Sequence, residues 1–311
     1  MDTAQARPEH YDLIVVGAGP AGLTAGMYAV RQGLTTAIVG AEVGGQAAWA
    51  SEVENYLGWR LVTGSELVTS FREHVAQFDI ECLEGQLVNA IVPAGDGFEV
   101  FTREGAHLAA RAIIVATGRT PNRLAVPGET EFIGRGVSYC ATCDGAFFRG
   151  MPVAVVGSTE SACDAALELA ALEATVTVVS ASALKAHESV LEKVAAEPRI
   201  TVRTGLKPTA VIGDDRVTGL AVRDATSGAE ETLAVSGVFI ETGSIPVSEF
   251  TGGLVEVTEH GEIVVDRHCR TSTPGIYAAG DVTDGLGKQI IIAAGEGARA
   301  AIAASRDLKR R

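Results

Sequence analysis

Residues 11–33, YDLIVVGAGPAGLTAGMYAVRQG, predict a strand, a glycine turn and a helix in immediate succession. The three glycines have the spacing Gly17-x-Gly19-x-x-Gly22, and a second apolar strand, TTAIVG, follows at residues 35–40. In such a turn the first glycine allows the tight bend, the second lets the backbone approach a pyrophosphate, and the third lets the helix pack closely on the strand. The N-terminus of the helix adds the positive end of its dipole. The stretch therefore predicts a dinucleotide-binding domain.

A second strand, turn and helix, VAVVGSTESACDAALELA at residues 153–170, repeats this pattern. Two further apolar strands, in RAIIVATGRTPN (111–122) and SGVFIETGSIP (236–246), each end in Thr-Gly. This symmetry predicts an α/β protein with two Rossmann-like, three-layer nucleotide-binding domains, the second inserted in the first. The expected boundaries are 1–118 and 245–311 for the outer domain and 119–244 for the inserted one.

The composition narrows the function classes. The formal net charge of −14 argues against nucleic acid as a partner, because phosphate binding needs a basic face. No apolar run reaches the roughly 18 residues of a membrane span, and the first residues lack the basic-then-apolar pattern of a secretion signal, so a cytoplasmic location is expected.

The cysteines form one C-x-x-C, made by Cys140 and Cys143, and three isolated positions. Two intervening residues let a single turn close a reversible disulfide, and a helix beginning there would lower the pKa of a thiolate. A zinc site would need two more Cys or His ligands at suitable spacing, so no metal is predicted. An inert buried pair is the other alternative.

Five stretches, in this order and spacing, resemble the low-molecular-weight thioredoxin reductases: GAGPAG (17–22), GGQAAWASEVENY (44–56), ATG (116–118), SYCATCDGAFFRG (138–150) and AAGDV (278–282). The resemblance covers essentially the whole chain. It implies FAD in the outer domain, a homodimer, a thioredoxin or thioredoxin-like partner, and rotation of the inserted domain between flavin and partner.

The resemblance also implies roles for individual residues. Cys143 is expected to face the flavin, Cys140 to attack the partner disulfide, and Asp144 to carry the proton. Asp281 is expected to bind the ribityl chain, and Glu42 has the spacing of a ribose-binding acid. The expected FAD-binding residues are Gly17, Gly19, Pro20, Ala21, Gly22, Glu42, Gly45, Gln46, Asn55, Ala116, Thr117, Gly118, Gly280, Asp281, Lys288, Gln289 and Ile290.

The second glycine turn departs from the family pattern. NADPH-using members carry Gly-x-Gly-x-x-Ala there, whereas this chain has Thr159 at the second glycine and Glu160 beside it. Ser180-Ala181-Ser182 stands where those members have a His-Arg-Arg cluster. Losing two arginine contacts to a 2′-phosphate costs about 3–6 kcal/mol, on the order of 10²–10⁴ in affinity. NADPH binding is therefore predicted to be lost, unless Lys185 or a distant arginine substitutes.

These features predict an FAD-dependent thiol-disulfide oxidoreductase similar to the ferredoxin-dependent flavin thioredoxin reductases or to the deeply rooted cyanobacterial type. Ferredoxin or flavodoxin are possible electron donors, but both are acidic, and the one basic cluster is the tail Arg306, Lys309, Arg310 and Arg311. Two alternatives stay open: a conventional NADPH-dependent thioredoxin reductase with an atypical nucleotide site, and a flavin-bound redox sensor.

Overall fold

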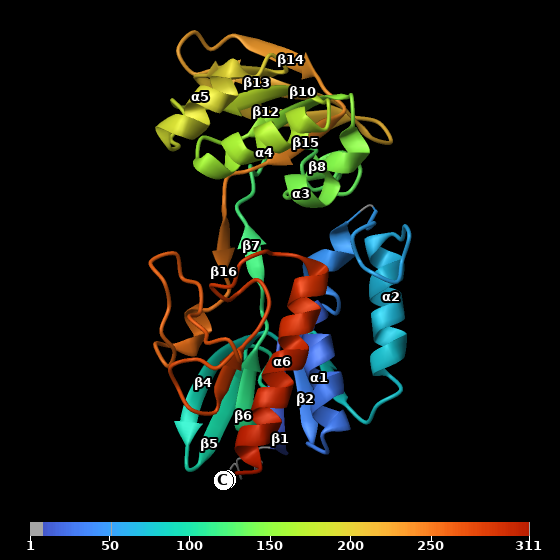
Figure 1. Ribbon diagram of the computed structural model, residues 1–311, viewed down its shortest axis with the longest axis vertical. Coiled ribbons are helices and arrows are strands. Elements are labelled where there is room, and N and C mark those ends of the chain that lie inside the picture. The colour runs from blue at the N-terminus through green and yellow to red at the C-terminus, as the bar shows by residue number, and fades with distance from the viewer. Residues whose placement is uncertain (1–8, 51, 311) are drawn as a thin grey trace, which may run out of the picture. The chain divides into compact units, whose positions relative to one another are not determined.

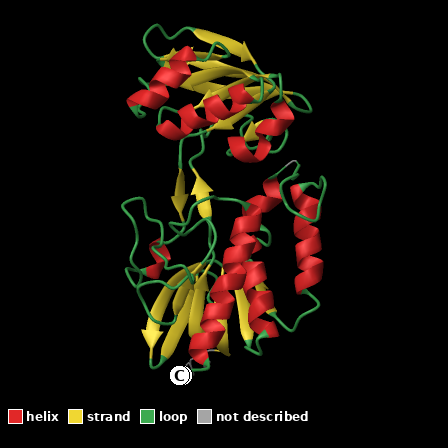
Figure 2. Ribbon diagram, viewed as in Figure 1, coloured by secondary structure: helices red, strands yellow, loops and turns green. Residues whose placement is uncertain are grey.

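The computed structural model describes residues 9–50 and 52–310, and its elements are drawn in Figures 1 and 2. The α-helices are α1 (Pro20–Arg31), α2 (Gly64–Val75), α3 (Ala141–Asp144), α4 (Glu160–Ala171), α5 (Glu188–Ala196) and α6 (Ile290–Leu308). Three 3-10 helices are η1 (Gly45–Trp49), η2 (Gly145–Phe148) and η3 (Glu249–Thr251). The strands are β1 (Glu9–Val16), β2 (Thr36–Gly40), β3 (Glu81–Glu84), β4 (Val88–Ala94), β5 (Gly97–Thr102), β6 (His107–Val115), β7 (Arg119–Pro121), β8 (Val137–Ser138), β9 (Pro152–Val156), β10 (Thr175–Ser180), β11 (Ile200–Thr204), β12 (Leu206–Gly213), β13 (Val217–Asp224), β14 (Glu230–Ala234), β15 (Gly237–Ile240), β16 (Ser244–Pro246) and β17 (Ile276–Ala278).

Contacts between residues divide the described chain into two compact units. The first contains residues 9–48, 56–120 and 245–310. The second contains residues 49–50, 52–55 and 121–244. The chain passes between them at β7 and β16, which pair with each other.

The first unit is built on a mixed sheet in the order β3-β2-β1-β6-β5-β4, with β17 also paired to β6. Strands β1, β2, β3, β6 and β17 are parallel, whereas β4 and β5 form an antiparallel extension. The four apolar residues of β1 from Leu13 to Val16 are at most 2% exposed, as expected where a parallel sheet is covered on both faces. Helices α1 and α6 lie side by side (Figure 1), and a Cβ added at Gly297 of α6 would lie 2.0 Å from the Ala21 carbonyl oxygen. This glycine therefore permits the close helix contact.

The second unit repeats the strand, turn and helix arrangement on a parallel sheet in the order β11-β10-β9-β15-β8. A separate antiparallel sheet, β12-β13-β14, packs on β15 and β10. Helix α4 covers β9 and β10 with its alanine-rich face, including the fully buried Cys163. The α/β class with two Rossmann-like domains, predicted from sequence, is confirmed.

A membrane-spanning helix is not found between residues 9 and 310, residue 51 excluded, because none there is both long and apolar enough to cross a bilayer. The first eight residues, on which the expectation of a missing secretion signal partly depends, lie outside the described residues.

Candidate active site

Cys140 and Cys143 form a disulfide at the start of α3, with their Cα atoms 5.3 Å apart. Cys140 is the residue that caps this short helix, and its backbone is extended, with φ −151°. The backbone N–H of Cys143 donates to Cys140 Sγ at 3.1 Å. A thiolate formed at Cys140 would therefore already have a hydrogen-bond donor, which stabilises the charged form.

Ser138 connects this disulfide to the acid that follows it. The buried Ser138 hydroxyl accepts from the Cys140 N–H at 3.0 Å and also hydrogen bonds with the Asp144 carboxyl. Burial raises the pKa of Asp144 above its ordinary value, and the hydrogen bond with Ser138 partly offsets that rise. A carboxyl with a raised pKa next to a disulfide is suited to hold and release a proton, which fits the role expected for Asp144.

Two further carboxylates lie against α3, and sequence reasoning did not single out either of them. The hydroxyl of Thr142 donates to Glu168 of α4 at 2.9 Å. The backbone N–H of Ala141 donates to Glu241, which directly follows β15. Burial raises the pKa of Glu241 to about 7; the Ala141 hydrogen bond lowers it and the charge of Glu168 raises it. The available signal was an acidic residue immediately after the buried strand GVFI.

The other cysteines take no part in this arrangement. Cys82 is exposed on the edge strand β3, whereas Cys163 and Cys269 are buried free thiols. No group of three or more His, Cys, Asp or Glu side chains that could hold a metal ion occurs in the part of the chain that the structure describes.

The first glycine turn has the geometry of a cradle for a ligand. Gly17 has φ +110°, and a Cβ there would lie 2.2 Å from the Ala116 carbonyl oxygen. A Cβ at Gly22 would lie 1.8 Å from the Gly17 carbonyl oxygen, so both positions require glycine for packing of the protein itself. By contrast, a Cβ built on Gly19 would meet no described atom within 4 Å apart from Gly19 and its chain neighbours. The space in front of Gly19 is what close approach of a pyrophosphate needs, and these residues fit a dinucleotide such as FAD.

Several residues predicted to bind FAD meet at the carboxyl ends of β1, β6 and β17. Ala116 N–H donates to the Val16 carbonyl at 2.7 Å, and Ala279 N–H donates to the Val115 carbonyl at 2.9 Å. Gly17, Ala116 and Gly280 therefore follow three adjacent strands, at the edge where open parallel sheets bind ligands.

Other residues predicted to bind FAD lie at helix ends or are exposed. Pro20 and Ala21 begin α1, Gln289 caps α6, Ile290 begins α6, and Glu42 is exposed after β2. The rest lie in η1 or directly after β6: Gly45 approaches Gly19, Gln46 donates to the Arg119 carbonyl, Thr117 donates to the Val247 carbonyl, and Gly118 has φ +67°. Asn55 belongs by its contacts to the second unit, so its expected contact with FAD stays a prediction.

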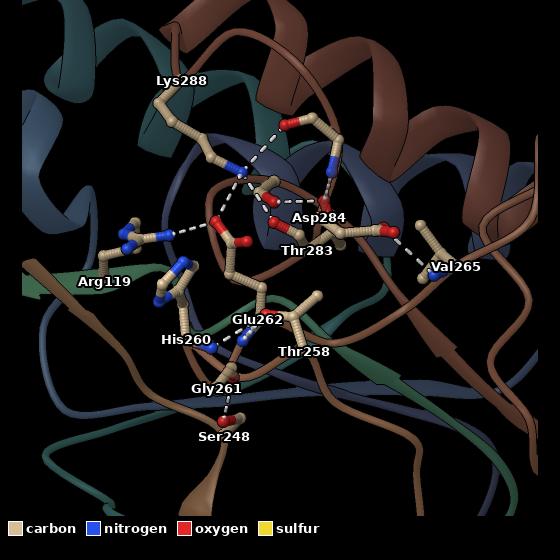
Figure 3. Close-up of polar contacts among 12 residues, drawn as sticks. Arg119, Ser248, Thr258, His260, Gly261, Glu262, Val265, Thr283, Asp284 and Lys288 are labelled. Atoms are coloured by element: carbon tan, nitrogen blue, oxygen red, sulfur yellow. Dashed lines mark hydrogen bonds and ion pairs between the residues drawn. The ribbon is translucent and has the colours of Figure 1, made fainter. Parts of the chain in front are cut away.

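Lys288 belongs to a charged cluster that the sequence did not predict (Figure 3). Its ammonium donates to the carbonyls of Thr283 at 2.6 Å and Gly285 at 2.9 Å, and lies 3.8 Å from Glu262. The Arg119 guanidinium donates to the same Glu262 carboxylate at 2.6 Å. Burial raises the pKa of Asp281, while the charges of Lys288 and Arg119 lower it. The Lys288 ammonium thus fastens the loop before α6, and the expected contact of Lys288 with FAD stays a prediction.

The second glycine turn is built differently from the first. Gly157 keeps the tight-turn role, since a Cβ there would lie 2.4 Å from the Glu241 carbonyl oxygen. The exposed Thr159 hydroxyl hydrogen bonds with Ser161 at 3.0 Å. The segment after β10 is fastened to the turn, because Lys185 N–H donates to the Ser158 carbonyl at 2.7 Å and His187 N–H donates to the Glu160 carboxylate at 2.9 Å.

Residues 11–297 match the family described as pyridine nucleotide-disulphide oxidoreductase, and the chain belongs to this family of flavin-dependent disulfide oxidoreductases. It is 40% identical over 300 residues to a subunit of the alkyl hydroperoxide reductase of Pseudomonas putida, which covers 95% of this chain and 58% of that protein. The chain thus spans little more than half the length of this curated relative.

Solved structures similar to this chain include thioredoxin reductases. That of Streptococcus pyogenes has a TM-score of 0.93 at 35% identity and covers 98% of this chain and 100% of that chain. One from Gloeobacter violaceus has a TM-score of 0.56 at 32% identity and covers 97% of this chain and 95% of that chain. The chain is therefore thioredoxin reductase-like in fold.

Proposed function

We propose that this protein passes electrons between FAD and the Cys140–Cys143 pair, and between that pair and a thioredoxin or thioredoxin-like protein, without NADPH as the donor. The observation that carries the proposal is the contrast between the two glycine turns. The turn at Gly19 opens onto free space, whereas the turn at Thr159 carries a branched side chain and is tied to the segment after β10.

FAD would be held by the turn Gly17–Gly22, by residues 116–118 and by the chain from Gly280 to the start of α6. When bound, it supplies two-electron exchange with the disulfide. Cys143 is proposed to exchange electrons with it, while Cys140 attacks the disulfide of the partner. Asp144, whose pKa is raised by burial, is proposed to protonate the thiolate that leaves.

The local charges at the second turn support loss of NADPH. Glu160 begins α4, where a bound pyrophosphate would meet its negative charge. Ser180 is buried and donates to the Ser182 carbonyl at 2.7 Å, so it offers no cation to a 2′-phosphate. The Lys185 side chain is exposed. These features support our proposal that the protein belongs with the flavoproteins that resemble thioredoxin reductases but lack the pyridine-nucleotide motifs.

Ferredoxin or flavodoxin is the proposed class of donor, with the basic tail as its docking site. Arg306 lies in the last turn of α6, Lys309 donates to the Gln32 carbonyl at 3.2 Å, and Arg311 lies outside the described residues. The similarity to the alkyl hydroperoxide reductase protein makes a peroxide-reducing protein a second candidate recipient of electrons. The homodimer, the cytoplasmic location and the domain boundaries at 118/119 and 244/245 stay predictions from sequence.

The test is an anaerobic titration of the FAD-containing protein with NADPH and NADH, followed by flavin absorbance. We expect no bleaching with either nucleotide and complete bleaching with dithionite. Stoichiometric bleaching by NADPH within seconds would overturn the proposal in favour of a conventional reductase. Stable adduct formation with thioredoxin and no turnover with any donor would instead indicate a redox sensor.

A further inference from the structure

Glu241 is a half-buried carboxylate that the proposed function does not use. Its backbone N–H donates to the Val156 carbonyl at 2.8 Å, which fixes it where β15 and β9 end side by side. Its side chain accepts the backbone N–H of Ala141, the residue that directly follows Cys140. The carboxylate therefore hydrogen bonds with the residue next to the one that carries the Cys140 sulfur.

The surroundings of Glu241 are acidic. The sequences of α3, η2, α4, β8 and β9 contain no lysine, arginine or histidine. Charged residues on the elements and segments packed nearby are Asp144 on α3, Glu160, Asp164 and Glu168 on α4, Arg223 and Asp224 on β13, and Lys185 and His187 after β10. Arg223 is paired with Glu230 at 2.6 Å, and the side chains of Lys185 and His187 are exposed. Glu168 is the neighbour whose charge acts on Glu241.

We propose that Glu241 is a positioning residue that takes up a proton when the Cys140–Cys143 bond is reduced, and that it thereby sets how much Cys140 thiolate is present near neutral pH. This inference rests on the proposed function, because it concerns the same disulfide. A thiolate at Cys140 Sγ accepts the Cys143 N–H, yet the adjacent Ala141 N–H is already bound to Glu241. Two negative charges then share one short stretch of backbone, and protonation of Glu241 removes one of them.

The step balances with a dithiol as the reductant. The Cys140–Cys143 bond breaks, the reagent forms its own disulfide, and two electrons and two protons pass to the protein. One proton goes to Cys143, and the other goes to Glu241 when Cys140 remains a thiolate. Because burial places the pKa of Glu241 at about 7, this proton can be taken up or released close to neutral pH.

The experiment measures the reactivity of Cys140 as a function of pH. The FAD-containing protein is reduced anaerobically with dithiothreitol, freed of reagent and treated with iodoacetamide from pH 5 to 9, and alkylation of Cys140 is read by peptide mass spectrometry. The variants are Glu241→Gln and Glu241→Ala, and the matched control is Asp164→Asn, which removes one charge from the exposed face of α4. Flavin absorbance and circular dichroism establish that each variant is folded.

We expect Glu241→Gln to increase the alkylation rate of Cys140 about twofold at pH 7, where Glu241 is about half protonated, and up to about tenfold above pH 8, where the wild type carries the full negative charge that opposes the thiolate. The midpoint potential of the disulfide above pH 7 should rise by about 30 mV, which is the same factor for a two-electron couple. Asp164→Asn should leave both unchanged.

A rate for Glu241→Gln within twofold of the wild type above pH 8, or an equal shift in Asp164→Asn, would overturn the inference. A second measurement keeps it testable if Glu241→Ala does not fold: reduction by dithiothreitol at pH 7 in weakly buffered solution should release fewer protons from the wild type than from Glu241→Gln. Neither measurement uses a nucleotide or thioredoxin. Failure here therefore leaves the proposed function standing, and bleaching by NADPH would overturn that function alone.

Discussion

The backbone N–H of Lys185 donates to the carbonyl oxygen of Ser158 across 2.7 Å. This hydrogen bond ties the segment after β10 to the second glycine turn, and the His187 N–H bond to Glu160 adds a second tie. The second turn therefore carries the Thr159 side chain and the Glu160 carboxylate at the positions where the first turn has Gly19 and Pro20.

Restoring a nucleotide site should therefore need changes at two places. We expect the triple variant Thr159→Gly, Ala181→Arg, Ser182→Arg to bind NADPH on the order of 10²–10⁴ more tightly than the wild type, through two new contacts to a 2′-phosphate. The measurement is isothermal calorimetry, with Thr159→Gly alone as the matched control. Tight binding of NADPH by the unaltered protein would contradict the prediction.

Alanine substitutions at Gly19 and Gly22 should affect FAD binding and folding stability separately. We expect Gly22→Ala to destabilise the fold by about 1–3 kcal/mol or more, because its Cβ would lie 1.8 Å from the Gly17 carbonyl oxygen. Gly19→Ala should cost at most about 1 kcal/mol, the usual loss at a helix cap, yet retain much less FAD. Denaturant unfolding and the flavin-to-protein absorbance ratio measure the two effects. If Gly19→Ala and Gly22→Ala lose the same amount of FAD and have the same stability, the assignment of Gly19 to the ligand is refuted.

Asp144→Asn should slow electron exchange with thioredoxin by about 10²–10⁴, the usual contribution of a positioned acid or base, while flavin content is unchanged. Stopped-flow absorbance of the flavin measures the rate. Ser138→Ala removes the hydrogen bond that lowers the pKa of Asp144. The alkaline limb of the pH–rate profile should therefore move to higher pH. A limb that moves to lower pH would show that Asp144 is not the group that titrates.

Glu262 should stabilise the first unit through two cations. Its pair with Arg119 has side chains only 16% and 21% exposed, so Glu262→Gln should cost about 1–3 kcal/mol by leaving Arg119 and Lys288 without their shared carboxylate. The control is Glu84→Gln, which breaks the exposed ion pair of Glu84 with Arg72 and should cost less than about 1 kcal/mol. Urea midpoints give both values, and equal losses would contradict the prediction.

Glu241 should also make stability depend on pH. Its pKa rises from 4.5 to about 7 on folding, so the folded state binds the proton more tightly than the unfolded state does. Stability from this group is present below about pH 4.5 and is lost as pH rises toward 7, by about 3 kcal/mol. The difference in unfolding free energy between pH 5 and pH 8 should therefore shrink in oxidised Glu241→Gln and stay unchanged in Asp164→Asn. If the unfolding free energies of the wild type and Glu241→Gln depend on pH in the same way, Glu241 does not contribute to the pH dependence of stability.

Sequence reasoning succeeded where function depends on local backbone. The fold class follows from the strand, turn and helix at residues 11–33. The glycines of a Gly-x-Gly-x-x-Gly turn set the backbone bend between the strand and the helix and allow the two to pack closely. The Cys140–Cys143 pair was equally visible, because two intervening residues let a single turn bring the two sulfurs together.

The tertiary structure alone decided which distant residues meet these local motifs. Glu262 reaches Arg119 across 143 positions of sequence, and Glu241 reaches Ala141 across 241 − 141 = 100 positions. Neither contact has a sequence period or motif, because each joins segments that are far apart in the chain. Sequence by itself therefore determined the two turns and the disulfide, whereas the carboxylates that surround them, and the pKa of Glu241, depend on long-range packing and burial.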